Sequence, residues 1–412
     1  MNCEWLSPSL SGSHMQKKGN TMARFVYADN AATTPVSCEV IAEMMPVFEN
    51  AWGNPSSQHR KGYEAKEVLD SARARIASVL GCKDSEIYFT SSGTESDNWA
   101  IKGAAYRMRE TKGRTHIVTT KIEHHAVLHT CEALKRDGFT VTYVGVDADG
   151  VVDPDEMRAA VTENTAVVAV MFANNEIGTV EPIAEICEIA HAKGALMFTD
   201  AVQAVGAVDV NLAELPVDML SLSGHKLHAP KGIGVLFIRK GVLINNLVDG
   251  GGQEKRKRGG TENVAYAVGL AKALEVAKER LPELDLVRAK RDRLIEALLG
   301  VPYSKLNGHR ETRLPGNVNI GFEFVEGESI LMWLDMAGIC ASTGSACSSA
   351  SLDPSHVLLA IGVPHEKAHG SIRLSLSHDT TDEDVDYIIE TLPPIIERLR
   401  KMSPLYEDLR KD

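Results

Sequence analysis

Cysteine is scarce in this sequence, and the few cysteines present are not arranged as disulfide or metal-binding patterns. Seven occur in 412 residues, and none forms a CxxC pair. An odd number of scattered thiols in a chain this long argues against a disulfide framework, and the spacing of structural zinc sites is absent. We therefore expect reduced thiols in a cytoplasmic protein, most of them packed as small buried hydrophobes.

An excess of positive charge and long apolar segments are also missing. The formal net charge is −12, whereas a general nucleic-acid binder needs a basic face to neutralise phosphates. No apolar run reaches the roughly 18 residues of a membrane span. The sequence thus predicts no nucleic-acid partner and no membrane partner. Its 44% hydrophobic content is ordinary for a globular protein and suffices for a sizeable core.

The first 24 residues differ from the rest of the chain. They begin MNCEWLSPSL, which lacks the basic start and continuous apolar core of a signal peptide. Residues 12–15 read GSHM and resemble a remnant of an expression vector. We expect residues 1–24 to be disordered or an added extension, and we leave them out of the fold argument.

From about residue 85, short β-rich runs alternate with helical stretches. The expected strands cover 86–90, 115–120, 140–146, 166–172, 195–199, 219–223 and 234–238. Helices are expected between them, at 95–108 and 125–136 among others. This succession predicts an α/β fold with a mostly parallel seven-stranded sheet wrapped by helices. Such sheets bind ligands at the carboxyl ends of their strands.

The pattern changes after about residue 263. A long helical stretch at 265–299 contains a break at Pro282, and a final amphipathic helix is expected at 382–402. Strands at 317–320 and 371–376, with a helix near 329–337, complete a smaller α+β domain.

A Ser/Gly turn follows the strand expected at 86–90. It contains Gly93 and Thr94 and leads into a helix. Glycine lets the backbone approach a ligand, and the helix offers unpaired N–H groups and a positive dipole end, which suit a phosphate. An ordinary capped turn, with Ser or Thr as N-cap, would show the same residues.

Two more polar residues follow buried strands. Asp200 ends the run 195–199, where it could cap a helix or pair with a buried cation such as a protonated ring nitrogen. Lys226 lies in a Ser/Gly/His turn after 219–223; it is either a surface lysine or an amine that loses its proton and acts as a Schiff-base nucleophile. A phosphate cradle, a carboxylate and an amine are the three groups that hold the phosphate, ring nitrogen and aldehyde carbon of pyridoxal phosphate.

Five motifs extend this interpretation: YADNAATT at 27–34, GNPSS at 53–57, NNEIG at 174–178, SGHK at 223–226 and RLSL at 373–376. Together they resemble the NifS/IscS-type cysteine desulfurases of the class V aminotransferase family, over residues 25 to 406. The resemblance implies the PLP-transferase fold type I, pyridoxal phosphate as cofactor, L-cysteine as substrate and a homodimer with active sites near the subunit boundary.

It also implies domain boundaries. Residues 25–38 are expected to pack with the small domain, and 39–264 to form the large cofactor-binding domain. Residues 265–412 are expected to form the linking helix and the small C-terminal domain that carries the catalytic cysteine loop.

The resemblance assigns roles to matching residues. Cofactor-binding roles fall on Gly93, Thr94, His124, Asn175, Asp200, Gln203, Ser223, His225, Lys226 and Thr261. Among these, His124 is expected to stack on the cofactor ring and move protons, and Thr261 to come from the opposite subunit. His125 is expected to be an exposed neighbour with a weaker claim. The substrate carboxylate is assigned to Asn175 and Arg373, because a planar guanidinium can donate two parallel hydrogen bonds.

Cys347 lies in the small, polar, glycine-bearing segment 341–350, which suits a mobile loop better than a core. A thiol in such a place is usually there for its reactivity. The resemblance makes Cys347 the catalytic cysteine, with Lys226 and His124 as the other catalytic residues, on a loop that swings between cofactor and acceptor. No resident metal is expected, although Cys347 could transiently contact an iron–sulfur cluster on an acceptor. Cys340 lies in a more apolar stretch and is expected to be buried.

Residues 253–258 read QEKRKR, and four of the six are basic. Such a run is usually a solvated loop, and the resemblance places it beside the substrate entrance. Arg258 matches the family, whereas Lys255 stands where the family often has arginine.

The sequence therefore predicts a cysteine desulfurase that forms L-alanine and a persulfide on Cys347, and that supplies an iron–sulfur scaffold or another sulfur-acceptor protein. A selenocysteine lyase or a small-amino-acid aminotransferase of the same family would share Lys226 and Asp200 but would not need Cys347. An inactive sulfur-pathway scaffold is opposed by the intact Lys226, Asp200, Arg373 and Cys347. The physiological acceptor stays open.

Overall fold

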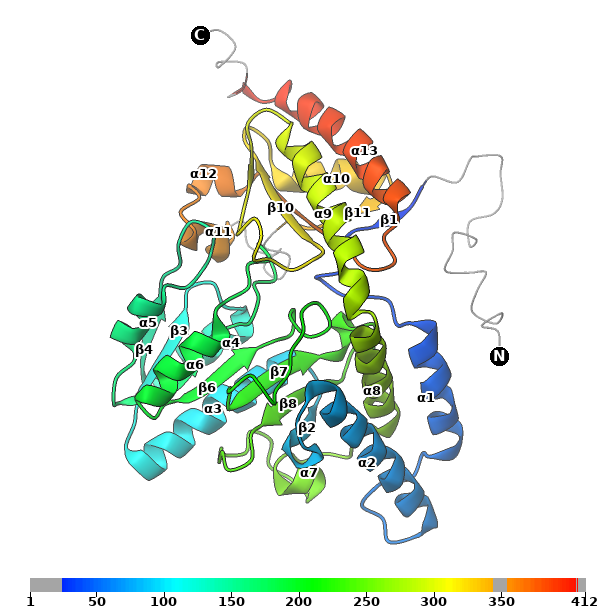
Figure 1. The fold of residues 1–412 in the computed structure, drawn as a ribbon, viewed down its shortest axis with the longest axis vertical. Helices are drawn as coiled ribbons and strands as arrows, with labels where there is room; N and C mark the ends of the chain where they lie inside the picture. Colours follow the sequence, from blue (N-terminus) through cyan, green and yellow to red (C-terminus); the bar gives the residue numbers. More distant parts are fainter. Residues whose placement is uncertain (1–23, 344–353, 405, 407–412) are drawn as a thin grey trace.

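A seven-stranded sheet forms the centre of the larger of two lobes in the computed structural model, which describes residues 24–343, 354–404 and 406 (Figure 1). In spatial order its strands are β2 (Ile87–Thr90), β8 (Gly234–Ile238), β7 (Met219–Ser223), β6 (Leu196–Asp200), β5 (Thr165–Ala169), β3 (His116–Thr120) and β4 (Thr140–Val144). The direction of β8 is opposite to that of the other six strands of this sheet, which all run the same way. The predicted α/β fold with a mostly parallel seven-stranded sheet is confirmed.

Helices cover both faces of this sheet. One face carries α3 (Gly93–Lys112) and α4 (His125–Arg136). The other carries α1 (Cys38–Asn50), α2 (Arg60–Leu80), α5 (Pro154–Ala160), α6 (Ile183–Ala192) and α8 (Val264–Glu279). Neighbouring strand residues alternate between the two cores: Ile117 belongs to the first and Val118 to the second, and both are fully buried. Burial on both faces explains why the strands read as nearly continuous apolar runs.

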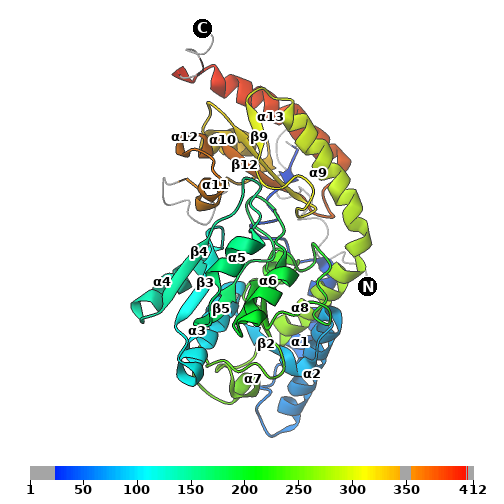
Figure 2. The same cartoon turned by 60° about the vertical axis from the view of Figure 1, so that its left-hand side comes forward.

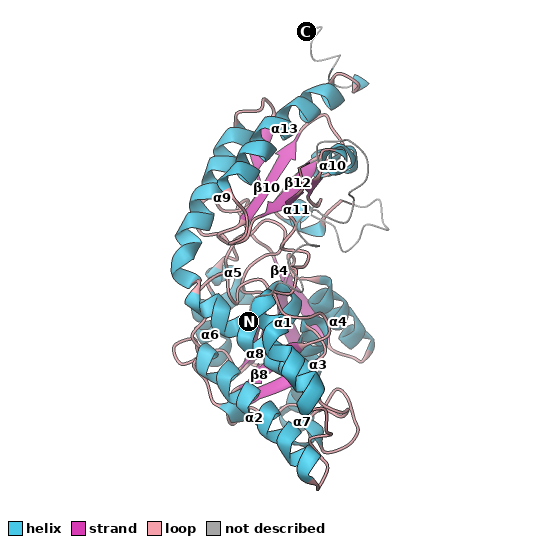
Figure 3. Ribbon diagram, turned by 90° about the vertical axis from the view of Figure 1, so that its right-hand side faces the viewer, coloured by secondary structure: helices cyan, strands magenta, loops and turns pink. Residues whose placement is uncertain are grey.

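The smaller lobe is built on a three-stranded antiparallel sheet, in the order β12 (Ser371–Ser375), β10 (Asn317–Phe322) and β9 (Ser304–Leu306). Its helices are α9 (Leu284–Leu299), α10 (Gly327–Met336), α11 (His356–Ala360), α12 (His365–Ala368) and α13 (Asp382–Arg400). Figure 3 shows the strands of the two sheets in separate halves of the molecule.

The beginning of the described chain also belongs to the smaller lobe. Strand β1 (Val26–Tyr27) pairs in parallel with β11 (Ile339–Cys340), and Val26 and Ala28 are buried in the core of this lobe. We keep the boundaries 25–38, 39–264 and 265–412 as our proposal for the domains.

One helical column joins the two lobes along one side of the molecule (Figure 2). It consists of α8, a 3-10 turn at Leu281–Glu283 and α9. The break falls at Pro282, as the sequence predicts, since proline has no N–H to continue the helical hydrogen bonds. Among the residues that the structure describes, no helix is both long and apolar enough to cross a lipid bilayer.

Candidate active site

A cavity of about 400 Å³ lies at the carboxyl ends of the parallel strands, with walls from both lobes. Ten predicted site residues line it: Gly93, Thr94, His124, Asn175, Asp200, Gln203, Ser223, His225, Lys226 and Arg373. Of the other two, Thr261 is exposed and lies outside the cavity of its own chain, and Cys347 is outside the described residues.

The N-terminus of α3 forms one end of the cavity. Ser92 caps the helix by accepting a hydrogen bond from the Glu95 N–H at 3.2 Å. A Cβ on Gly93 would lie only 2.6 Å from the Val202 Cγ2 atom, so a larger residue does not fit without displacing Val202. The first-turn N–H groups and the helix dipole therefore stay open to an anion, as a phosphate requires.

Lys226 and His225 enter the cavity from the short turn after β7. The Lys226 Nζ atom donates to the carbonyl oxygens of Ala31 and Ala32, at 2.5 and 2.8 Å. Burial and the nearby lysine charges lower the pKa of His225 to about 4, so its imidazole is neutral near pH 7. Its Nδ1 atom lies 3.1 Å from the Thr33 hydroxyl.

Two buried carboxyl groups meet beneath the cavity. Asp200 is 6% exposed and Asp97 is 1% exposed. The Ser221 hydroxyl donates to Asp97 Oδ1 at 2.6 Å. Burial is the largest cause that raises the pKa of each carboxyl; the Asp200 charge raises that of Asp97 further, whereas His124 and Lys226 pull that of Asp200 back down.

The burial of the two carboxyls determines where a proton must be. Two neighbouring buried carboxylates disfavour each other's charge, so one of them keeps its proton. The pKa of Asp97 is the more strongly raised, so we assign the proton to Asp97 and the negative charge to Asp200. A buried carboxylate of this kind fits a protonated ring nitrogen. The sequence interpretation missed Asp97; its only signal was an acid on the otherwise buried face of α3, beside Trp99 and Ala100.

Histidines form another wall of the cavity. His124 caps α4, and its Nδ1 atom accepts the Ala126 N–H at 3.1 Å, which fixes the ring. The expectation that His125 is exposed was wrong. It is half-buried in the same cavity, with its ring centre 5.0 Å from that of His129 and 4.8 Å from that of His356. Burial is the main cause that lowers the pKa of His125 to about 4, and the neighbouring imidazoles lower this pKa further.

Arg373 lies on β12 at the side of the cavity formed by the smaller lobe. It is 2% exposed, so it is not the surface residue that a strand arginine usually is. Its Nη1 atom donates to the Asn175 carbonyl at 2.9 Å, and its Nη2 atom to Asp29 Oδ1 at 3.0 Å. Its Nε–H has no hydrogen-bond partner among the described residues. A buried guanidinium with a spare donor is suited to a carboxylate ligand.

Two more buried acids lie beside these groups, and the sequence interpretation missed both. Glu123 accepts hydrogen bonds from the Thr120 hydroxyl at 2.6 Å and the Met171 N–H at 3.0 Å, and burial raises its pKa to about 8. Glu176 lines the cavity, and burial raises its pKa to about 7 despite a hydrogen bond from Ser355. Nothing in the local sequence distinguishes these acids from surface residues.

The basic segment at 253–258 is held in place rather than fully solvated. Glu254 is buried and forms a two-point ion pair with Arg73, with distances of 2.7 and 2.8 Å. Lys255 donates to the Asp84 carbonyl at 3.0 Å, and Arg258 pairs with Glu95 at 2.8 Å. The segment does not line the cavity of its own chain. Cys340, expected to be buried, is only half-buried.

Comparison with known proteins agrees with this arrangement. The aminotransferase class-V family matches residues 26–388. A curated cysteine desulfurase IscS from Methanosarcina thermophila is 54% identical over 387 residues, which cover 94% of this chain and 95% of that protein.

Solved structures agree as well. A NifS-like protein superposes with a TM-score of 0.86 at 40% identity, covering 91% of this chain and 100% of that one. A structure described as SspA in complex with cysteine superposes with a TM-score of 0.75 at 35% identity, covering 85% of this chain and 98% of that one. The chain therefore belongs to the class-V aminotransferase family and, within it, to the cysteine desulfurases.

Proposed function

We propose that this cysteine desulfurase takes sulfur from free L-cysteine, leaves L-alanine and carries the sulfur as a persulfide on Cys347. One observation carries the proposal: the Lys226 amine, the Asp200 carboxylate and the N-terminus of α3 converge on the cavity that also contains the Arg373 guanidinium. A structural relative described as a complex with cysteine supports the choice of substrate.

The residues of the cavity fit pyridoxal phosphate. Its phosphate would be held at the N-terminus of α3 by Gly93 and Thr94, with Ser223 and His225 opposite. Its ring nitrogen would pair with Asp200, and its aldehyde carbon would attach to Lys226. The bound cofactor would supply an electron sink for the α-carbon of the substrate. Gln203 and Asn175 remain candidates for its ring hydroxyl, and Thr261 of the partner subunit for its phosphate.

The side chains of this protein would then bind the substrate and move its protons. Arg373 would hold the substrate carboxylate through its Nε–H, which donates a hydrogen bond to no described residue. Lys226, released as a free amine, would remove the proton from the α-carbon of the substrate and then deliver it to a different atom. Asp200 would keep the ring nitrogen protonated, and His124 would assist proton transfer at the sulfur.

Sulfur transfer would follow thiolate chemistry. The Cys347 thiolate attacks the substrate sulfur, and an S–S bond forms as the C–S bond breaks. The electron pair of the broken bond stays with the three-carbon fragment, which takes up protons and leaves as alanine. The persulfide would pass to an acceptor, such as an iron–sulfur scaffold protein. We also propose the homodimer and the cytoplasmic location that the resemblance implies.

Two substitutions separate the roles of the cofactor and the thiol. Lys226→Ala should abolish the visible absorbance of the bound cofactor, whereas Cys347→Ala should keep it and lose sulfide release. Lys231→Ala and Cys340→Ala are the matched controls, because Lys231 is exposed beside the site and Cys340 is a second thiol. Normal desulfuration by Cys347→Ala, together with loss in Cys340→Ala, would overturn the assignment of the thiol.

A further inference from the structure

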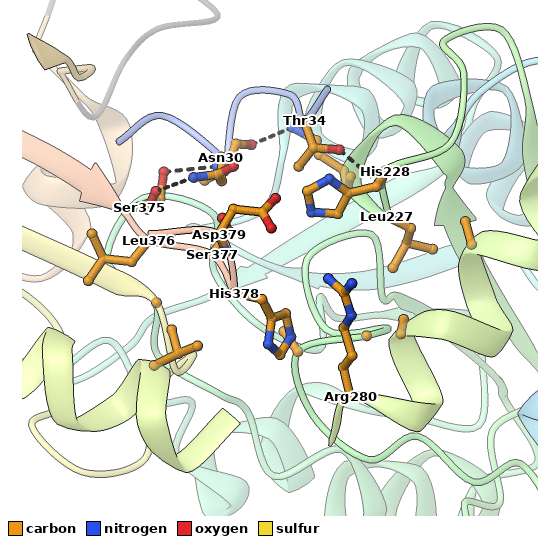
Figure 4. A pocket seen from close by; sticks show the side chains of 18 of the residues that line it. Asn30, Thr34, Leu227, His228, Arg280, Ser375, Leu376, Ser377, His378 and Asp379 are labelled. Atoms are coloured by element: carbon orange, nitrogen blue, oxygen red, sulfur yellow. Dashed lines mark hydrogen bonds between the residues drawn. The ribbon is translucent and has the colours of Figure 1, made fainter. Parts of the chain in front are cut away.

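A second cavity, the hinge cavity, adjoins the active site at the bend between α8 and α9 (Figure 4). Its volume is about 460 Å³, compared with about 400 Å³ for the active-site cavity. The two cavities share Ala31, Val202, Gln203 and Lys226 as lining residues. The proposed mechanism uses no other residue that lines the hinge cavity.

Apolar side chains from both lobes make up much of the wall. Ala277 comes from α8, Leu284 and Val287 come from α9, and Leu314 and Leu376 come from the smaller lobe. A ligand seated here would touch both lobes and the helical column that joins them. Volumes of 300–1,000 Å³ with mainly apolar walls and a few polar groups are typical of small-molecule sites.

Among the polar side chains that line this space are Arg280, His228, His378 and Asp379 (Figure 4). The Arg280 Nη2 atom lies 3.7 Å from Glu39 Oε1, which is an ion pair too long for a hydrogen bond. The guanidinium therefore keeps N–H groups that can bind a carboxylate.

His228 supplies an acceptor in the same space. Its Nδ1 atom lies 3.1 Å from the Pro35 carbonyl, and because a carbonyl only accepts, this nitrogen carries the hydrogen. Burial lowers the pKa of His228, so the ring is neutral and its Nε2 atom is an acceptor. The backbone of His228 has a φ of 60°, which is costly for a residue other than glycine, and its N–H donates to the Thr34 hydroxyl at 2.9 Å.

The charges decide which ligand fits. Apart from Lys226, which the cofactor would engage, the lining contains one base, Arg280, and two acids, Glu39 and Asp379. Arg280 can donate to a carboxylate and Asp379 can accept from an ammonium, and a zwitterion supplies both groups. Its carboxylate meets Arg280, its ammonium meets His228 Nε2 and Asp379, and an apolar side chain fills the space against Leu284 and Leu376. We propose that the hinge cavity is a second small-molecule site, which binds an α-amino acid with a large apolar side chain.

Occupancy of this site would be linked to the state of the active site. Ala31 lines both cavities, and its carbonyl accepts the hydrogen bond from Lys226 Nζ. A ligand that contacts both lobes would also favour one relative orientation of the lobes over others. By linkage, the amino acid and the active-site ligands then alter each other's affinity by the same factor.

The test is calorimetric titration of the cofactor-loaded enzyme with L-phenylalanine. Because an amino acid could also enter the active site, the titration is repeated with Arg373→Gln, where hinge binding should persist. Arg280→Gln should weaken binding by at least about tenfold. Ala277→Phe should abolish binding by filling the cavity. Arg288→Gln is the matched control, since Arg288 is an exposed arginine of α9 that pairs with Asp285 outside the cavity.

Two truncated probes examine the chemistry of the ligand. 3-Phenylpropionate lacks the ammonium and phenethylamine lacks the carboxylate, so each should bind at least about tenfold more weakly than L-phenylalanine. The proposal is overturned if L-phenylalanine gives no heat, if its affinity is unchanged in Arg280→Gln, or if binding is lost in Arg373→Gln alone. If Ala277→Phe does not fold, as judged by its unfolding temperature, Arg280→Gln with its control still decides the question.

Discussion

Replacing Asp97 by asparagine tests the assignment of the buried proton. Asparagine has nearly the shape of a protonated aspartate, and its amide oxygen can accept the hydrogen bond from the Ser221 hydroxyl. Burial is the largest cause that raises the pKa of Asp97, and the negative charge of Asp200 raises it further. Each unit by which a pKa is raised corresponds to about 1.4 kcal/mol of differential stability. These two effects are the reason that Asp97 keeps its proton.

The expected signature is a stability difference that depends on pH. Below the ordinary pKa of aspartate, Asp97 is protonated in both the folded and the unfolded chain. Above it, only the unfolded chain loses this proton, so the native protein becomes less stable than Asp97→Asn as the pH rises. The difference grows by about 1.4 kcal/mol per pH unit until the raised pKa of the folded state is reached. Between pH 5 and pH 7 it would change by up to about 3 kcal/mol.

Urea unfolding at matched protein concentration, at pH 5, 6 and 7, measures this difference. The other titrating groups are common to both proteins and cancel. Glu110→Gln is the control, because Glu110 is an exposed acid on the same helix, so this substitution removes a carboxyl group without changing a buried one. Parallel curves for the native protein and Asp97→Asn, within about 0.5 kcal/mol across this range, would mean that Asp97 is ionised in the fold, and the assignment of the proton to Asp97 would fail.

Three further predictions concern single residues. Arg373→Lys keeps the charge but loses the planar pair of donors, so steady-state kinetics should show KM for cysteine raised about tenfold to hundredfold, with a smaller change in kcat. Gly93→Ala places a Cβ 2.6 Å from Val202 Cγ2, so dialysis should remove the cofactor from this variant faster than from the native enzyme. The pKa of Glu123 is raised to about 8 by burial, so urea unfolding should show Glu123→Gln becoming progressively more stable than the native protein from pH 5 to pH 8.

The sheet and most of the cavity could be predicted from the sequence because their signals are local. A strand buried on both faces is an apolar run, and the polar residue that ends it, as Asp200 ends β6, faces the ligand side of a parallel sheet. The strand expected at 166–172 was too long, because β5 ends at Ala169. Beyond Ala169 the chain still forms a backbone hydrogen bond to β6 through the Phe172 N–H, and it then turns toward Asn175.

The remaining features depend on packing between distant segments. Asp97 and Glu123 look like ordinary polar residues in the sequence, and their burial depends on distant segments: Ser221 on β7 contacts Asp97, and the Met171 N–H after β5 donates to Glu123. His125 was misjudged because the residue that covers it, His356, is far along the chain. The hinge cavity has no local signal, since its walls come from segments spread from Asn30 to Asp379.

The pairing of β1 with β11 has a consequence for synthesis on the ribosome. Val26 emerges first, but its partner Ile339 follows 313 residues later (339 − 26), a delay of roughly 15–60 s at ordinary translation rates. During this time the strands at 87–238 are complete and can pair, whereas the segment that contains Ala31 has no partner strand beside it. The Ala31 carbonyl can accept its hydrogen bond from Gln203 early, whereas the Ala31 N–H must wait for the Ser375 hydroxyl of β12. This wall of the active site is therefore completed only after most of the chain has emerged.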